Sequence, residues 1–147
     1  DAGIDVDVVS GLTAGIAGPA ALGIPVTDRR HAPGVALVTG HAQDGDHGPD
    51  WPALARSGLT LVVYMGVARV GAIVDGLRSG GLAGDTPVAV ISAAHTPRQR
   101  HALTTLADLQ ATVERERLAS PAVLVVGDVV RRAVSAWPAW PQAAVSA

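Results

Sequence analysis

Four short apolar runs constrain the fold of this chain more than any other feature. They cover residues 35–39, 59–64, 87–91 and 123–126, and glycine, proline or polar residues bound them. Runs this short and this apolar are typical of strands buried on both faces. Helical patterns separate them, so we predict a sheet that is at least partly parallel, with helices on its faces. The fold class is α/β.

The side chains available for the core are almost entirely aliphatic. The 147 residues are 48% hydrophobic, yet they include no Phe, one Tyr and three Trp. A chain of this length can bury a sizeable core in one domain. Val, Ala, Leu and Ile suit buried strands covered by helices, which supports the α/β prediction.

Charge and cysteine content exclude several classes of function. The formal net charge is −2, and all eleven basic residues are Arg. They are scattered and form no basic stripe, so we expect no nucleic-acid partner. The absence of Cys excludes disulfides and thiolate metal sites and fits a cytoplasmic protein. No apolar run reaches the ~18 residues that cross a bilayer, so we expect no membrane partner.

The first part of the chain follows a strand, loop and helix pattern. Apolar and acidic residues alternate over residues 4–8, which predicts a half-buried strand. The glycine-containing stretch 10–15 leads into an Ala-rich helix that should end near Gly23, because Ile24 precedes a proline. Residues 27–33 are predicted to form a linker.

Two helices are predicted between the apolar runs in the middle of the chain. Asp50 is a candidate N-cap for a short helix that ends at about Ser57. Apolar residues at three- and four-residue spacing predict a second, amphipathic helix that Gly80 and Gly81 should stop. Its apolar residues are Val67, Val70, Ile73, Val74 and Leu77.

The last third of the sequence predicts a further strand, a helix and a tail. Residues 98–104 could add an antiparallel strand. Thr105 is a candidate cap for a helix with Leu106, Leu109 and Val113 on one face. Residues 133–147 have no helical or strand period, and we expect a disordered tail.

One cluster of polar residues resembles a metal site. His41, Asp44, Asp46 and His47 lie within seven residues of one another. The neighbouring Gly45 and Gly48 instead indicate a flexible, solvated loop, so we predict no metal. No role is assigned to His31 or His101.

Periodicity leaves the function open, because no glycine-rich stretch has the spacing of a Walker loop or a dinucleotide fingerprint. Several sequence segments are more informative. They are VVSGLTAGIAGPAALGIPVTDR (8–29), VALVTGH (35–41), DWPALA (50–55), LVVYMG (61–66), TPVAVI (86–91), TPRQR (96–100), TLADL (105–109) and SPAVLVVGDVV (120–130). In this order and spacing they resemble the tetrapyrrole methylases and, within them, the uroporphyrinogen-III methyltransferases, from about residue 2 to residue 132.

The resemblance implies a tetrapyrrole methylase-like fold with S-adenosyl-L-methionine in a cleft between two α/β domains. Residues 1–34 would be the end of the N-terminal domain and the linker. Residues 35–132 would be the C-terminal α/β/α domain, with a mixed sheet. The family's acid and base groups would lie upstream of Asp1, so we assign no catalytic residue and expect an upstream part.

The resemblance also assigns cofactor contacts to Thr13, Ala14, Met65 and Ala94. Thr13 and Ala14 lie at a loop-to-helix entry, where backbone N–H groups can meet a polar ligand. Met65 follows a strand and offers a soft apolar surface. The C-terminal ends of strands are where open α/β sheets place ligands.

Arg29, Arg98 and Arg100 are candidates for binding the tetrapyrrole, because guanidinium groups pair with its carboxylates. The chain departs from the family pattern at three places. Ser10 replaces a usual Pro, Asp28 replaces a usual His, and Ala94-His95 replaces a common Gly-Thr. His95 could change the polarity of the cleft.

The expected activity is the methylation of uroporphyrinogen III to precorrin-2, in siroheme and cobalamin biosynthesis, by a homodimer. One alternative is another precorrin methyltransferase, and the same fold also carries ribosomal-RNA and diphthamide methyltransferases. A non-enzyme alternative is an inactive module for dimer contacts and half a cofactor site. We expect residues 1–147 alone to show no turnover.

Overall fold

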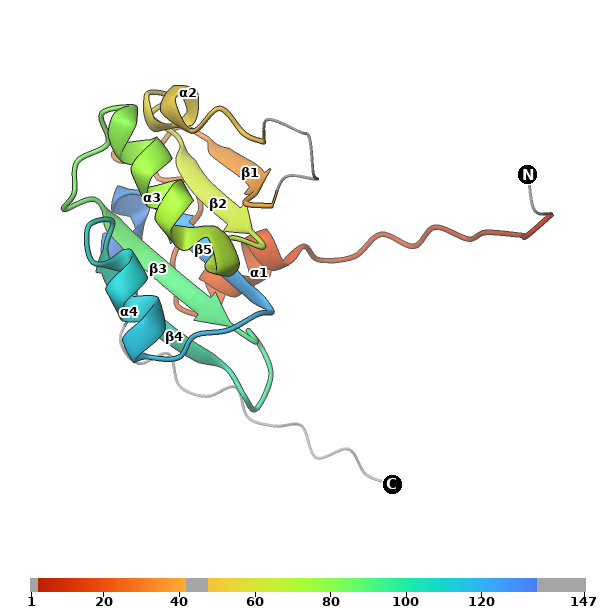
Figure 1. Cartoon of the computed structure of the whole chain (residues 1–147). Coiled ribbons are helices and arrows are strands. Elements are labelled where there is room, and N and C mark those ends of the chain that lie inside the picture. Colours follow the sequence, from red (N-terminus) through yellow and green to blue (C-terminus); the bar gives the residue numbers. More distant parts are fainter. Residues whose placement is uncertain (1–2, 42–47, 135–147) are drawn as a thin grey trace.

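A five-stranded mixed sheet forms the centre of the molecule in the computed structural model, which describes residues 3–41 and 48–134 (Figure 1). Its strands are β1 (Val35–Thr39), β2 (Thr60–Tyr64), β3 (Pro87–Ser92), β4 (Arg100–Thr105) and β5 (Ala122–Val126). They lie in the order β1-β2-β5-β3-β4. Only the β1–β2 pair is parallel among these neighbours, which confirms the prediction of a partly parallel sheet.

The last strand in sequence occupies the middle of the sheet. β5 runs antiparallel between β2 and β3, with Val62 and Ala89 both opposite Val125. Its central residues Leu124 and Val125 are fully buried, as a strand covered on both faces requires. The predicted antiparallel strand near residue 100 is confirmed as β4, which pairs with β3.

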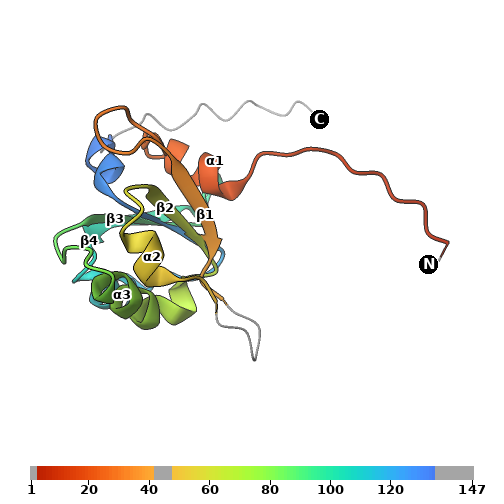
Figure 2. The same cartoon turned by 90° about the horizontal axis from the view of Figure 1, so that it is seen from above.

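Helices cover both faces of the sheet, so the fold is α/β/α (Figure 2). One face packs against α2 (Trp51–Ala55), α3 (Val70–Ser79) and α4 (Leu109–Arg115). The 3-10 turn η1 (Val67–Arg69) leads into α3. The other face carries α1 (Ala14–Ala20) and the 3-10 turn η2 (Asp128–Arg132). Leu22, Ile24, Val129 and Val130 belong to the core on that face.

The predicted helix signals in the middle of the chain are confirmed. The Asp50 carboxylate accepts a hydrogen bond from the Ala53 backbone N–H at 2.9 Å and caps α2. The apolar face of α3 buries Val70, Ile73 and Leu77 against the sheet. Gly80 follows the last residue of α3, as expected.

Two local predictions were wrong. Residues 4–8 form no strand: Ile4, Val6 and Val8 are 76%, 77% and 92% exposed. A strand needs a neighbour for its backbone hydrogen bonds, and within the described ranges 3–41 and 48–134 none pairs with this segment, which extends away from the body (Figure 1).

The second error concerns Thr105, which ends β4 opposite Pro87 and is not the N-cap of α4. Its hydroxyl accepts the Asp108 backbone N–H at 3.3 Å, but the N-cap residue is Asp108. Leu106 donates its backbone N–H to the Thr86 carbonyl at 2.8 Å, so this segment still belongs to the sheet edge, and α4 begins only at Leu109.

At the end of the described chain, Val134 donates its N–H to the Leu22 carbonyl at 3.0 Å. The rest of the predicted tail, from residue 135, lies outside the described residues.

Over the described ranges, no helix is both long and apolar enough to cross a membrane.

Candidate functional site

The C-terminal ends of β2 and β3 meet the beginning of β5, because β5 runs antiparallel between them. A cavity of about 680 Å³ lies beside this meeting point, and we call it the strand-end cavity. Small-molecule sites commonly enclose roughly 300–1,000 Å³, so the cavity is of suitable size. Its walls are Ala14, Tyr64, Met65, Ile91, Ala93, Ala94, Thr96, Arg98 and residues 120–123.

Three of the four predicted cofactor residues line this cavity, although they are far apart in sequence. Ala14 begins α1, Met65 follows β2, and Ala94 lies in the loop after β3. Met65 is 58% exposed and lines the cavity, so it does not fill the core. Thr13 is not a wall residue, but its hydroxyl hydrogen-bonds with the Tyr64 hydroxyl, and Tyr64 is one.

Helix α1 fits closely against the sheet at this cavity. The Tyr64 hydroxyl accepts the Gly15 backbone N–H at 2.9 Å. A Cβ atom on Gly15 would overlap the Tyr64 hydroxyl, and one on Gly18 would lie only 2.9 Å from Val123 Cγ2. Glycine at both positions therefore lets the helix backbone approach the strands.

Backbone strain is concentrated on the loops around the strand-end cavity. Met65, Ala93 and His95 have φ angles of 53°, 47° and 59°, and they are three of the four described non-glycine residues with positive φ. This left-handed conformation is unfavourable for residues with a Cβ, and it persists where the surrounding contacts hold it. Such strain is common at ligand-binding sites.

The three candidate arginines occupy different places. Arg98 is the one charged residue among the walls of the strand-end cavity, as far as the described residues go. Arg100 begins β4, is exposed, and does not line the cavity. Arg29 lies in the turn between Asp28 and Ala32, at the other end of the sheet. The structure thus brings Arg98, but not Arg29, to the predicted cofactor residues.

The turn that carries Arg29 is held by the Asp28 carboxylate. Asp28 Oδ1 accepts the Arg30 backbone N–H at 2.9 Å and lies 3.0 Å from His31 Nδ1. Asp28 Oδ2 lies 3.5 Å from Arg132 Nη2, which ties the turn to η2. The Arg30 N–H first, and then His31 and Arg132, hold the pKa of Asp28 below its ordinary value, despite some opposing desolvation.

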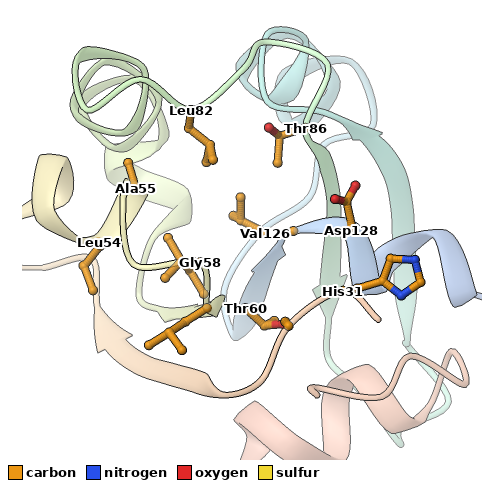
Figure 3. Close-up of a pocket in the computed structure, with 13 residues that line it drawn as sticks. His31, Leu54, Ala55, Gly58, Thr60, Leu82, Thr86, Val126 and Asp128 are labelled. Carbon is orange, nitrogen blue, oxygen red and sulfur yellow. The ribbon is translucent and has the colours of Figure 1, made fainter. Parts of the chain in front are cut away.

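A second, smaller cavity of about 150 Å³ lies at this end of the sheet. Figure 3 shows His31 and Asp128 on one side of it and Leu54 and Ala55 on the other. The fully buried Thr60 also lines it, and the Thr60 hydroxyl has no hydrogen-bond partner among the described residues. No predicted cofactor or substrate residue lines this cavity.

Of the cluster considered as a metal site, only His41 is described. Its backbone N–H donates to Thr39 Oγ1 at 3.3 Å. Asp44, Asp46 and His47 lie outside the described residues, so the loop prediction stays a prediction.

Sequence reasoning missed several wall residues. Tyr64 is the only Tyr of the chain and directly precedes Met65, so its position was the available signal. Residues 120–123 were recognised as part of a motif but given no role, because the antiparallel insertion of β5 is what brings them to the cavity.

Comparisons with known proteins agree with this geometry. The Uroporphyrinogen-III C-methyltransferase of Pseudomonas aeruginosa is 53% identical over 133 residues, which cover 90% of this chain and 54% of that relative. The Siroheme synthase of Azotobacter vinelandii is 46% identical, over 88% of this chain and 28% of that relative. The Uroporphyrin-III C-methyl transferase of Thermus thermophilus, solved with S-adenyl homocysteine, superposes with a TM-score of 0.74 at 34% identity, over 88% of this chain and 53% of that one.

The chain therefore spans about half the length of the curated methyltransferases that it matches. The family signature of the Tetrapyrrole (Corrin/Porphyrin) Methylases matches residues 1–110, which is most of the chain. Together with the mixed sheet and the cavity at its strand ends, this match shows that the chain belongs to the tetrapyrrole methylase family.

Proposed function

We propose that this chain provides one wall of the S-adenosyl-L-methionine site of a uroporphyrinogen-III C-methyltransferase. The strand-end cavity is the observation that carries the proposal, because it gathers Ala14, Met65 and Ala94 from three distant segments. The names of the relatives support the activity, and the relative solved with S-adenyl homocysteine supports the cofactor.

The walls of the cavity fit such a cofactor. Most of them are apolar, and the Met65 side chain adds a polarizable surface against which an adenosyl group can pack. Met65 and Ala93 directly follow β2 and β3, have left-handed backbone angles, and both border the cavity. Arg98, a charged residue in the same walls, supplies a positive charge suited to a carboxylate of the tetrapyrrole substrate.

The cofactor supplies an activated methyl group, so the protein mainly has to align the two reactants. Alignment of an acceptor carbon with a methyl group removes much of the entropic barrier. A base must then remove a proton from the methylated tetrapyrrole. Among the described residues, the walls of the strand-end cavity include no carboxylate, histidine or lysine to accept this proton.

We therefore propose that residues 1–34 are the end of one methylase domain and its linker and that residues 35–132 belong to the other. The proton-transfer groups and the opposite wall would come from outside residues 1–147. Arg98 is the favoured contact for a substrate carboxylate. The roles of Arg29 and Arg100, the homodimer and the cytoplasmic location stay predictions.

Transfer of a labelled methyl group under anaerobic conditions tests the proposal. The full-length protein should methylate uroporphyrinogen III twice to give precorrin-2, and residues 1–147 at equal concentration should show no turnover. An Arg98→Ala variant of the full-length protein should raise the KM for the porphyrinogen more than the KM for the methyl donor. Turnover by residues 1–147 would show that the proton-transfer groups lie within these residues. Label transfer only to a later precorrin would favour the activity of another precorrin methyltransferase.

A further inference from the structure

Helix α1 forms one wall of the strand-end cavity, but little of its own structure fixes its position. It has only seven residues, and the segment before it is exposed over residues 3–13. A helix this short gains little stability by itself, so contacts with the body must hold it. One contact is at its N-terminal end, where the Tyr64 hydroxyl accepts the Gly15 N–H.

A second contact comes from the loop after β3. His95 Nε2 lies 2.7 Å from the carbonyl oxygen of Ala17, 78 residues away in sequence. Because a carbonyl only accepts, Nε2 must carry the proton and donate it. This hydrogen bond connects the loop that contains Ala94 with the helix that contains Ala14. Because both residues line the strand-end cavity, the bond connects two of its walls.

Other hydrogen bonds fix the loop conformation in which His95 contacts Ala17. Its φ of 59° is in the left-handed region, which a residue with a Cβ rarely adopts. Its backbone N–H donates to Gln99 Oε1 at 2.7 Å, and the loop is closed by the Thr96 hydroxyl, which donates to the Ala93 carbonyl at 2.7 Å. The residue itself is exposed, so burial of the ring does not explain the strained backbone.

We propose that His95 is a positioning residue that fixes α1 and thereby sets the width of the strand-end cavity. Tyr64 bonds to Gly15 at the N-terminal end of α1, and His95 bonds to Ala17, two residues later, so two separate elements of the body restrain the helix. The link to cofactor affinity rests on the proposed function. The mechanical part, in which His95 restrains α1, stands on the hydrogen bond alone.

The test uses residues 1–147 and three variants, with S-adenosylhomocysteine as the probe. His95→Ala removes the donor. His95→Gln keeps an N–H donor the same number of bonds from the backbone. His101→Ala is the matched control, because His101 is an exposed histidine on β4 outside the cavity walls. Hydrogen exchange of the α1 amides and NMR titration with the probe are measured for each.

We expect the α1 amides of His95→Ala to exchange about five- to tenfold faster, which is the effect of losing one hydrogen bond. The dissociation constant for the probe should rise about three- to tenfold, because part of the population has α1 displaced. His95→Gln should restore both values to within about twofold of the wild type, and His101→Ala should change neither. Imidazole nitrogen spectra of the wild type should show a protonated Nε2.

Unchanged α1 exchange in His95→Ala, or a wild-type imidazole protonated only at Nδ1, would overturn the proposal. Faster exchange of the α1 amides in His95→Ala with an unchanged dissociation constant for the probe would overturn the claim that this contact sets the width of the cavity. If residues 1–147 do not bind the probe, the same titrations are run on the full-length protein and its His95→Ala variant. Absence of binding there would overturn the proposed function, whereas faster α1 exchange in His95→Ala would still support the positioning role of His95.

Discussion

Substitution of Gly18 by Ala should change the stability in a direction that depends on Val123. Gly18 is buried within α1, and a Cβ atom there would lie 2.9 Å from Val123 Cγ2 and 3.9 Å from Ala94 Cβ. Val123 is 5% exposed, and its β-branched side chain has few alternative rotamers. The valine methyl cannot move aside easily, so the helix would have to shift.

Two opposing effects determine the size of the change. Alanine is favoured over glycine inside a helix by about 1 kcal/mol. Overpacking of a buried contact costs roughly 1–3 kcal/mol. We therefore expect Gly18→Ala to lower the free energy of unfolding by up to about 2 kcal/mol. In a Val123→Ala background the clashing methyl is absent, and the same substitution should raise it by up to ~1 kcal/mol.

Urea denaturation of the wild type, both single variants and the double variant at 25 °C measures this coupling. Val123→Ala alone should cost about 2 kcal/mol, because a buried side chain loses two methyl groups. Equal m-values would show that the unfolding transitions are comparable. Additive effects of the two substitutions, or a Gly18→Ala variant that is more stable than the wild type, would refute the close packing of α1 on β5.

Three further outcomes are expected. Met65→Glu in the full-length protein should weaken S-adenosylmethionine binding by at least ~1.4 kcal/mol, or tenfold, in calorimetry; an unchanged dissociation constant would remove Met65 from the site. Tyr64→Phe should lower the free energy of unfolding by about 1 kcal/mol, because the Gly15 N–H and the Thr13 hydroxyl lose a partner; denaturation with no change in midpoint would contradict those bonds. Because the folded-state pKa of Asp28 lies below its ordinary 3.8, the carboxylate stabilises the fold above pH 3.8, and this stability is lost as the pH falls through the folded-state value. Asp28→Asn should therefore be less stable than the wild type at neutral pH, with a difference that shrinks in acid; a difference that stays constant across the pH range would show that the charge of Asp28 does not matter.

The local elements of this protein follow from its sequence, because they depend on neighbouring residues. The apolar runs gave the positions of β1, β2, β3 and β5 to within a residue or two. Asp50 predicted the start of α2, since an N-cap bonds a backbone N–H three residues away. Met65, Ala14 and Ala94 came from the motif resemblance, and the structure brings these three residues to one cavity.

The arrangement of these elements was decided by tertiary structure. No local pattern predicted that β5 would enter between β2 and β3, because strand pairing depends on hydrogen bonds between distant segments. That insertion brings Val123 to the cavity. Tertiary packing also places Arg98 and Arg29 at opposite ends of the sheet. Residues 4–8 have a strand pattern and form no strand, since a strand also needs a partner. The contact of His95 with Ala17 depends on a strained backbone angle, which the identity of neither residue reveals.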